Sequence, residues 1–449
     1  MPTETKTHLS RYAVWSTNDY KKPDGSTFRL LYFTAAPCLL ALPTHIADHL
    51  RSERFSQLNP HTLYHLEEAG VLTHASRDDE LRCVMERLQS STTSGTRRSF
   101  VVMPTANCNL HCTYCPQVNT NHSYSESLQQ KVTQRILNST TDPKVTNVDV
   151  RWYGGEPLLA YASIMELSSS VLPVFDARGI TYTSMMVTNG SLLSAQKFTD
   201  LTTKCRVKTI VVTLDGGERS NNITRINRAG RGMYRLIIDN LASIVKFTNA
   251  PQGTKVIVRV NISPTSANCI DDLLNDLHRI GATAPLFELQ FMPVYSWHQD
   301  NSQHIPDNVT VDGAIRSAYH RASNLNIGLP TLPSQTKHKL CPAVGRAEEI
   351  ITPDGGIFSC TEDPLVPGYH SQRQLTTIDA LGSDKLRPPD RYDDWYLRIN
   401  DFECSNCPLL PVCGGSCPQR WIEGQPACPP LRRELQLRMD QYAKKARLL

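Results

Sequence analysis

Three closely spaced cysteines are the residues of this sequence best suited to bind a metal centre. Cys108, Cys112 and Cys115 form a C-x3-C-x2-C pattern directly after a predicted strand at 99–103. Three thiolates on one short loop can bind a single [4Fe–4S] cluster, which normally takes four cysteines. One iron would then stay open, as a catalytic metal site keeps a free position. The alternatives are zinc, or a cluster whose fourth ligand lies far away in the sequence.

Polar motifs follow the next three predicted strands. The second strand, at 148–153, ends in Gly154-Gly155-Glu156-Pro157. Glycines let a ligand approach the backbone closely, and a carboxylate accepts hydrogen bonds from an ammonium group. By itself, this motif is also an ordinary strand-to-helix turn. Asn189 ends the third strand, and Thr213 and Asp215 end the fourth. Barrel enzymes bind ligands at the carboxyl ends of their strands, so these residues can share one site with the cysteines.

The cysteine spacing, with the aromatic Tyr114 before the last cysteine, resembles that of the radical S-adenosylmethionine (SAM) enzymes. In that family the open iron chelates SAM, and one electron cleaves SAM to a 5′-deoxyadenosyl radical that abstracts hydrogen from the substrate. The family usually has a His-Asp pair where this chain has Asn221-Asn222. The resemblance implies SAM contacts at Tyr114, Gly154, Gly155, Glu156, Pro157, Asn189, Thr213 and Arg225.

Seven further cysteines lie near the carboxyl end of the sequence. They follow the pattern C-x13-G-x4-C, then C-x2-C-x5-C-x3-C, then a last cysteine. A zinc ribbon would account for four of them but not for the other three. The full pattern resembles the SPASM domain, the auxiliary-cluster domain of peptide-modifying radical SAM enzymes. The resemblance implies three [4Fe–4S] clusters in all, with one auxiliary cluster on Cys404, Cys407, Cys413 and Cys428 and another on Cys341, Cys360 and Cys417.

Strands alternate with helices from residue 99 onward, which predicts parallel strands joined by right-handed crossovers. The six predicted strands are fewer than the eight of a closed barrel. The expected fold is therefore α/β, a partial (β/α)6 radical SAM barrel with an N-terminal winged-helix-like domain and a C-terminal cysteine-rich SPASM domain. A doubly wound sheet is the alternative. The strands are expected at 99–103, 148–153, 180–188, 207–214, 255–262 and 287–293, and the helices between them at 125–138, 158–172, 194–204, 233–247 and 268–281.

Four domains are expected along the chain. Residues 1–95 combine two strands, at 28–33 and 38–42, with three short helices, which is the pattern of a winged-helix module. In peptide-modifying relatives such a module binds the leader of the substrate peptide at a sheet edge, which the hairpin at 28–42 would offer here. The alternative is a structural cap on the barrel. The radical SAM core would span 99–300, the SPASM domain 338–430 and a C-terminal helix 431–449.

Composition excludes several other classes of protein. The net charge of +4, from 47 Lys and Arg against 43 Asp and Glu, is too small to predict a nucleic-acid or membrane-surface partner. We find no secretory signal at the start of the sequence, and the longest apolar stretch is broken by Thr34 and Pro37. Closely spaced cysteines in such a chain favour metal binding over disulfides, and we expect a cytoplasmic protein.

These features predict an enzyme that modifies a ribosomally made precursor peptide bound through its leader. The expected product is a side-chain cross-link, through a carbon–carbon, ether or thioether bond, and an external flavodoxin- or ferredoxin-type protein would supply electrons. The alternatives are formylglycine formation on a sulfatase, a small-molecule SPASM dehydrogenase, and a non-catalytic electron carrier or zinc-binding protein. Asp215 and Glu288 are candidates for the catalytic base, and the alternative for each is a structural or solvated carboxylate.

Overall fold

The computed structural model describes residues 7–246, 250–296, 302–338, 340–382 and 385–446. The chain divides into two compact units that are interleaved in sequence. Unit 1 comprises Met1–Ser94, Thr331–Val344 and Asp394–Leu449. Unit 2 comprises Gly95–Pro330 and Gly345–Asp393. The cysteine-rich segment 338–430 therefore contributes residues to both units.

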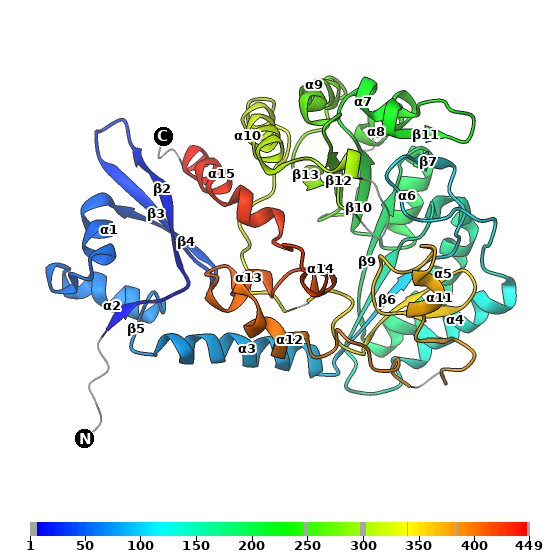
Figure 1. The fold of residues 1–449 in the computed structure, drawn as a ribbon, viewed down its shortest axis with the longest axis horizontal. Coiled ribbons are helices and arrows are strands. Elements are labelled where there is room, and N and C mark those ends of the chain that lie inside the picture. Colours follow the sequence, from blue (N-terminus) through cyan, green and yellow to red (C-terminus); the bar gives the residue numbers. More distant parts are fainter. Residues whose placement is uncertain (1–6, 247–249, 297–301, 339, 383–384, 447–449) are drawn as a thin grey trace. The chain divides into compact units, whose positions relative to one another are not determined.

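Unit 2 is built on a sheet of nine strands in the linear order β13-β12-β10-β9-β8-β6-β14-β15-β16, so the described part of the sheet is open (Figure 1). The six predicted strands lie side by side in it and are parallel, which confirms the α/β prediction. Their bounds are β6 (Arg97–Val102), β8 (Asn147–Trp152), β9 (Thr181–Thr188), β10 (Thr209–Leu214), β12 (Lys255–Ile262) and β13 (Phe287–Pro293).

Three short strands from the cysteine-rich segment extend this sheet beyond its first predicted strand. β14 (Glu348–Ile351) pairs with β6 in parallel, and β15 (Gly356–Phe358) and β16 (Thr376–Thr377) continue antiparallel. The sequence analysis did not predict them, because runs of two to four residues show no clear alternation. Cys360 lies two residues after the end of β15 and belongs to unit 2.

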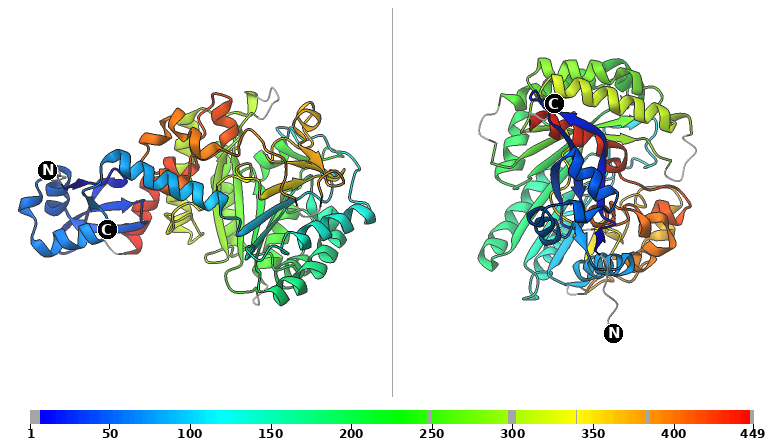
Figure 2. Two further views of the ribbon diagram at one scale, coloured as in Figure 1. Left: turned by 90° about the horizontal axis from the view of Figure 1, so that it is seen from below. Right: turned by 90° about the vertical axis from the view of Figure 1, so that its left-hand side faces the viewer.

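The crossover helices form the outer layer of the curved sheet (Figure 2). Alternation along β12 distinguishes the two faces: Val256, Val258 and Val260 are buried, whereas Arg259 and Asn261, which alternate with them on the opposite, inner face, are only partly buried. The inner face is therefore partly polar. The helices between the predicted strands are α4 (Glu126–Asn138), α5 (Tyr161–Arg178), α6 (Ala195–Thr203), α8 (Tyr234–Val245) and α9 (Ile270–Arg279), followed by α10 (Asn308–Asn324).

One segment of unit 2, Pro157–Arg178, is long and apolar enough by composition to cross a membrane. In the structure it contains α5, which connects the adjacent parallel strands β8 and β9. The side chains of Ile164, Val171 and Phe175 are buried there. Helices that cover a parallel sheet are apolar for this reason, so the fold accounts for the composition of the segment.

Unit 1 contains an antiparallel sheet of three strands in the order β2-β3-β4. The predicted hairpin is confirmed as β3 (Thr27–Phe33) and β4 (Cys38–Pro43), but β2 (Ala13–Lys21) was not predicted. Of the two strands of the hairpin expected to offer the leader-binding edge, β3 is therefore central in the sheet and β4 lies at its edge. Three helices follow as predicted: α1 (Thr44–Arg51), α2 (Pro60–Glu68) and α3 (Arg77–Thr93), with a small ladder between β1 (His8–Leu9) and β5 (Leu72–Thr73).

Helices cover both faces of this small sheet. Leu31 and Phe33 on one face pack in a core with residues of α1, α2 and α3, and that core also includes Trp395 and Leu410 from the cysteine-rich segment. The opposite face carries Leu30, which packs against residues of α15 (Pro430–Lys445). The amino-terminal and carboxyl-terminal parts of the chain thus share two cores within unit 1, and Figure 1 shows α15 beside the strands β2 to β4.

Candidate functional site

The first cysteine group lies on the loop that follows β6 in unit 2. Within the loop, β7 (Leu110–Cys112) forms an antiparallel ladder with β11 (Arg225–Asn227), and Arg225 lies opposite Cys112. The Thr113 N–H also donates to the Thr224 carbonyl at 2.9 Å. The loop is therefore fastened to the segment that follows β10, and all three cysteines sit at the carboxyl ends of the parallel strands.

Amide groups surround the first of these cysteines. The Leu110 N–H donates to the Cys108 Sγ at 3.4 Å, and the Asn189 Nδ2 lies 3.9 Å from the same sulfur. Asn189 Nδ2 also donates to Asn109 Oδ1 at 2.8 Å. Burial raises the pKa of Cys108 to about 11. Because cluster ligands bind as thiolates, N–H donors at this sulfur would favour the ligating form.

The two glycines of the Gly-Gly-Glu-Pro motif pack against the backbone of the cysteine loop. A Cβ on Gly154 would lie 2.8 Å from the Thr105 carbonyl oxygen, and one on Gly155 would overlap the Asn107 carbonyl. Gly154 also has a φ of +119°, a backbone conformation that residue types other than glycine rarely adopt. The sequence predicted that a ligand approaches the backbone of this motif closely. In the structure, the backbone of the cysteine loop makes the close approach.

Glu156 is buried, and its carboxylate is already hydrogen-bonded within the protein. Its Oε1 accepts from the Leu158 N–H at 3.0 Å and from the Thr188 hydroxyl at 2.7 Å, and its Oε2 accepts from the Asn189 N–H at 2.7 Å. Burial raises the pKa of Glu156, and these donors oppose the shift. The carboxylate thus caps the short helix that begins at Pro157 and ties the ends of β8 and β9 together.

Tyr114 is the centre of a polar network behind the cysteines. Its hydroxyl donates to Asp215 Oδ1 at 3.0 Å and accepts from Arg225 Nη1 at 2.9 Å and Asn261 Nδ2 at 3.0 Å. Asp215 Oδ2 accepts a further bond from the Thr224 hydroxyl at 2.7 Å. Burial raises the pKa of Asp215, and the charge of Arg225 opposes that shift. Both carboxylate oxygens help to hold the loop, so Asp215 positions Tyr114, and its role as a catalytic base stays a prediction.

The two remaining predicted site residues, Thr213 and Glu288, lie near opposite ends of the parallel strands. Thr213 is buried on β10, opposite Arg259 of β12 and near the carboxyl end of the strands. Glu288 is the second residue of β13, where its carboxylate pairs with Lys255 Nζ at 2.8 Å. That is the amino end of the strands, away from where barrels bind ligands. Glu288 therefore lies away from the cysteine loop in an ion pair, and its role as a base stays a prediction.

Four polar residues that the sequence analysis did not single out gather near the inner face of the sheet. Arg259 Nε donates to Gln290 Oε1 on the neighbouring strand at 2.9 Å. Burial raises the pKa of Tyr153 to about 12, with Glu362 adding to the shift and Arg259 opposing it. Glu362 follows Cys360 by two residues. Alternation along β12 could have identified Arg259 from the sequence, because residues two apart on a strand lie on the same face and Arg259 therefore shares a face with Asn261.

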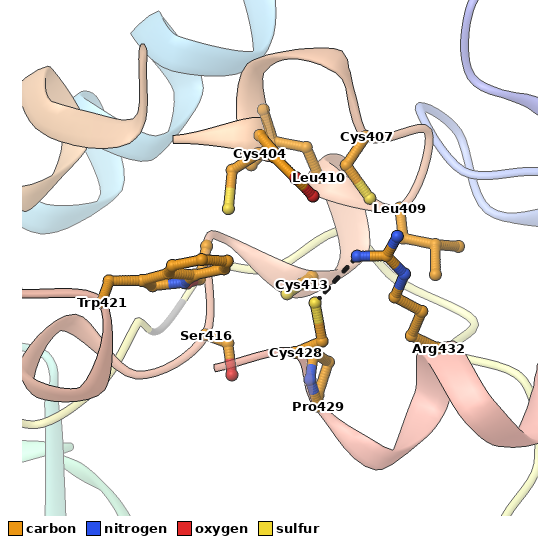
Figure 3. A pocket seen from close by; sticks show the side chains of 12 residues that line it. Cys404, Cys407, Leu409, Leu410, Cys413, Ser416, Trp421, Cys428, Pro429 and Arg432 are labelled. Carbon is orange, nitrogen blue, oxygen red and sulfur yellow. Dashed lines mark hydrogen bonds between the residues drawn. The ribbon is translucent and has the colours of Figure 1, made fainter. Parts of the chain in front are cut away.

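The second cysteine group has one well-defined part, in unit 1. Cys404, Cys407, Cys413 and Cys428 line a single cavity together with apolar Leu409, Leu410 and Trp421 (Figure 3). Burial and then the neighbouring Cys413, Cys407 and Cys428 thiols raise the pKa of Cys404 to about 12. The structure therefore brings together the four cysteines that the SPASM resemblance assigns to one cluster. Of the other three, Cys341 and Cys417 belong to unit 1 and Cys360 to unit 2.

The arrangement of these thiols can be compared with that of a zinc site. Within the described ranges, no three or more His, Cys, Asp or Glu side chains converge on a point that could hold one metal ion. Zinc needs its sulfur ligands about 2.3 Å from one centre, whereas a [4Fe–4S] cluster binds four thiolates around a larger body. A zinc site and a [4Fe–4S] cluster on these four cysteines therefore both stay predictions.

Comparisons with known proteins agree with the cysteine chemistry. Residues 93–237, which include Cys108, Cys112 and Cys115, match a family model described as a 4Fe-4S single cluster domain. The chain is 23% identical over 335 residues to the serine-type anaerobic sulfatase-maturating enzyme of Klebsiella aerogenes, covering 69% of this chain and 77% of that enzyme. The resemblance to the radical SAM maturases is confirmed, and the chain is an enzyme.

Solved structures show the same fold. Native anSMEcpe with bound AdoMet, which is SAM, and Kp18Cys peptide has a TM-score of 0.56 at 14% identity, covering 78% of this chain and 98% of that chain. Streptococcus suis SuiB bound to precursor peptide SuiA covers 93% of this chain at 16% identity, with a TM-score of 0.47 that is too low to support an argument. The large, mostly parallel sheet of unit 2 is thus that of the radical SAM maturases.

Proposed function

We propose that this enzyme uses SAM and a [4Fe–4S] cluster on Cys108, Cys112 and Cys115 to join two side chains of a ribosomally made peptide. The observation that carries the proposal is the cysteine loop, whose three thiols are fixed at the carboxyl ends of six parallel strands by the β7–β11 ladder. When bound, the cluster and SAM supply reductive SAM cleavage and an organic radical that removes a hydrogen atom from the substrate.

The residues around the cysteines then have distinct proposed tasks. The Tyr114 network fixes the loop from behind, through Asp215, Arg225 and Asn261. Asn189 and the Leu110 N–H hold the Cys108 sulfur in its ligating form. The predicted SAM contacts at Gly154, Gly155, Glu156, Pro157 and Thr213 stay a proposal, in which Glu156 acts by fixing the neighbouring backbone because its carboxylate already accepts three protein donors.

The substrate peptide would meet the inner face of the sheet. Arg259, Gln290 and Tyr153 lie on three different strands or strand ends of that face, and Glu362 comes from the segment after β15. A guanidinium, an amide, a phenol and a carboxyl can bind the carbonyl and N–H groups of a peptide backbone. We propose that these four residues orient the reacting part of the peptide.

The leader would bind by strand addition at the edge of the sheet in unit 1. β3 is excluded as that edge, because it pairs with β2 on one side and β4 on the other. β2 has a register shift between Trp15 and Asp19, and its Thr17 N–H is already bonded to Gln436 Oε1 at 2.7 Å. The outer edge of β4 is the remaining choice. It supports leader binding better than β3, which is the central strand of the same sheet.

Proline variants of the full-length chain test that edge. Successive N–H groups of a strand point to opposite sides, so one of Leu40→Pro and Ala41→Pro removes an outward donor. Leader affinity measured by calorimetry should fall for that variant while peptide-independent SAM cleavage is kept. Deleting residues 1–95 would be a poor test, because they share two cores with residues 394–449. Unchanged affinity in both well-folded variants would contradict leader binding at β4.

Auxiliary clusters on Cys404, Cys407, Cys413 and Cys428, and on Cys341, Cys360 and Cys417, complete the proposal. A peptide radical that closes onto a second side chain must lose one further electron, which a nearby cluster can accept. The flavodoxin- or ferredoxin-type reductant and the cytoplasmic location remain predictions.

Formylglycine formation is the second candidate, and the Klebsiella aerogenes relative favours it. One observation speaks against it. The alignment with anSMEcpe includes 98% of that chain but only 78% of this chain. This chain thus has about a fifth of its residues outside that alignment, which is comparable in size to its amino-terminal 95 residues. A small-molecule dehydrogenase would need neither those residues nor a sheet edge for a leader.

Mass spectrometry of candidate peptides made together with the enzyme decides between these reactions. A neighbouring small open reading frame supplies the first peptide, and a sulfatase peptide supplies the second. A cross-link removes two hydrogen atoms and suppresses fragmentation between the joined residues. Formylglycine gives an aldehyde that reacts with a hydrazide probe. A product with the aldehyde and normal fragmentation would replace cross-linking by formylglycine formation.

A further inference from the structure

One arginine lies among the four cysteines of unit 1. Arg432 lines the cavity that Cys404, Cys407, Cys413 and Cys428 share, and its Nη1 donates to the Cys428 Sγ at 3.0 Å (Figure 3). A cysteine sulfur that binds iron keeps lone pairs, so it can still accept this hydrogen bond when a cluster is in place. The only other ionisable side chain lining the described cavity, apart from the cysteines, is Glu403, which carries the opposite charge.

The helix that carries Arg432 is held firmly in place. Arg432 is in the first turn of α15, and Gln436 and Asp440 follow at intervals of four residues on the same side of the helix. Gln436 Oε1 accepts from the Thr17 N–H, and Asp440 Oδ1 accepts from the Tyr20 hydroxyl, each at 2.7 Å. The guanidinium is therefore presented to the Cys428 sulfur from a fixed base rather than from a mobile tail.

We propose that Arg432 is a positioning residue that raises the reduction potential of the auxiliary cluster bound by Cys404, Cys407, Cys413 and Cys428. The inference rests on the proposed function, which places a cluster there. Reduction adds one negative charge to a cluster, so a cation and an N–H donor at a ligand sulfur stabilise the reduced form more than the oxidised form. The amino end of α15 contributes a positive field in the same direction.

A raised potential suits the step that would follow hydrogen abstraction. When the peptide radical forms its new bond to a second side chain, that side chain loses a proton to a base or to water, and one electron must leave the peptide. Arg432 would favour the transfer of this electron to the auxiliary cluster, which is thereby reduced by one electron. An external carrier protein then reoxidises the cluster. The proton and the electron that leave the peptide are thus both accounted for, the first by the base or water and the second by the carrier protein.

Potentiometric electron paramagnetic resonance (EPR) on the full-length protein tests the proposal, with iron content measured on every sample. Arg432→Met removes the charge and the donor, Arg432→Gln removes the charge but keeps a donor, and Arg432→Lys keeps the charge without the planar fork. The EPR signal of this auxiliary cluster is identified as the one that disappears in Cys413→Ala. Lys444→Gln is the matched control, because it removes one positive charge from an exposed position on the same helix, about 18 Å along its axis.

Arg432→Met is expected to lower the ratio of reduced to oxidised cluster about tenfold at a fixed potential, which corresponds to about 59 mV for one electron. The shift should be smaller for Gln and Lys and absent for Lys444→Gln. An unchanged potential in Arg432→Met with full iron, or an equal shift in Lys444→Gln, would overturn the proposal. If Arg432→Met loses iron, the Gln and Lys variants decide by the same criterion, and iron loss in all three would leave Arg432 as a structural residue only.

The proposed function fails in a different way. In that case, Cys413→Ala would lower neither the iron content nor any EPR signal, and the cavity would hold no cluster for Arg432 to influence.

Discussion

The two cysteine sites of this chain are held by different kinds of structure. Cys108, Cys112 and Cys115 lie within eight residues on a loop, fastened by a strand ladder and by the polar Tyr114 network. Cys404, Cys407, Cys413 and Cys428 come from a longer segment, and the side chains between and beside them pack into the apolar cores of unit 1. The first site depends on hydrogen bonds at strand ends, and the second depends on the packing of residues from both ends of the chain.

The difference indicates that the two sites can be disrupted independently. A polar network that positions a loop governs geometry within an existing fold, whereas a core shared by distant segments governs whether the surrounding fold forms. Changes at the first site should therefore act mainly on SAM cleavage. Changes around the second should act on product formation and, where they reach the cores, on stability.

Replacing Cys108, Cys112 and Cys115 together with alanine should have the largest effect. SAM cleavage should be abolished and the iron content should fall by one cluster, because no thiolates remain on the loop. The iron of the second group should be kept. Iron analysis and 5′-deoxyadenosine measured by liquid chromatography test this, and normal 5′-deoxyadenosine formation would contradict the radical SAM mechanism.

Cys407→Ala should separate SAM cleavage from product formation. Removing one ligand should destabilise the auxiliary cluster, while the SAM site in unit 2 stays intact. Uncoupled 5′-deoxyadenosine should still form, and the modified peptide should be lost. Cys83→Ala is the matched control, since Cys83 is exposed on α3 and belongs to neither group. A well-folded Cys407→Ala protein that makes product at the normal rate would assign the second group a structural role.

Gly155→Ala tests how the first site is packed. An added Cβ would overlap the Asn107 carbonyl, so the cysteine loop must shift to make room. Displacements of about 1 Å at a reacting site can cost about 100-fold in rate, and we expect SAM cleavage to fall by this order. Gly313→Ala on α10 is the control, because a Cβ there meets nothing within 4 Å. Equal SAM cleavage rates in the two variants would show that this close approach is unimportant.

Local patterns explain why much of unit 2 could be predicted from the sequence. The strands at 255–262 and 287–293 have the predicted bounds, because alternation and flanking turn residues mark them. β2 escaped prediction since its residues 16–19 are all polar, which hides the alternation that a bulge further breaks. The strands β14 to β16 escaped because they are too short to show any period.

The SPASM resemblance likewise grouped the four cysteines that share a cavity. The residues that hold the cysteine loop of unit 2 could not be predicted in the same way. Tyr114, Asp215 and Asn261 are far apart in the sequence and of ordinary types, so only the register of β10 and β12 brings them together. Arg432 is one of several basic residues on an amphipathic helix, and nothing in its sequence context distinguishes it. Glu288 shows the same limit, because the sequence places this carboxylate on β13 but does not show that it pairs with Lys255 at the amino end of the strands.

Tyr114→Phe should have the smallest effect and shows most directly that the first site relies on hydrogen bonds. Loss of the hydroxyl leaves Arg225, Asn261 and Asp215 each without one partner, while the ring still fills its place. Such unpaired groups cost about 1–3 kcal/mol, and a loss of about 1.4 kcal/mol in loop positioning corresponds to a tenfold slower reaction. SAM cleavage should fall roughly tenfold, with iron content and auxiliary EPR signals unchanged. Tyr64→Phe, at a side chain 61% exposed on α2, should leave the rate as it is. If Tyr114→Phe cleaves SAM at the wild-type rate, the ladder between β7 and β11 holds the loop without the network, and the contrast between the two cysteine sites is weaker than the hydrogen bonds suggest.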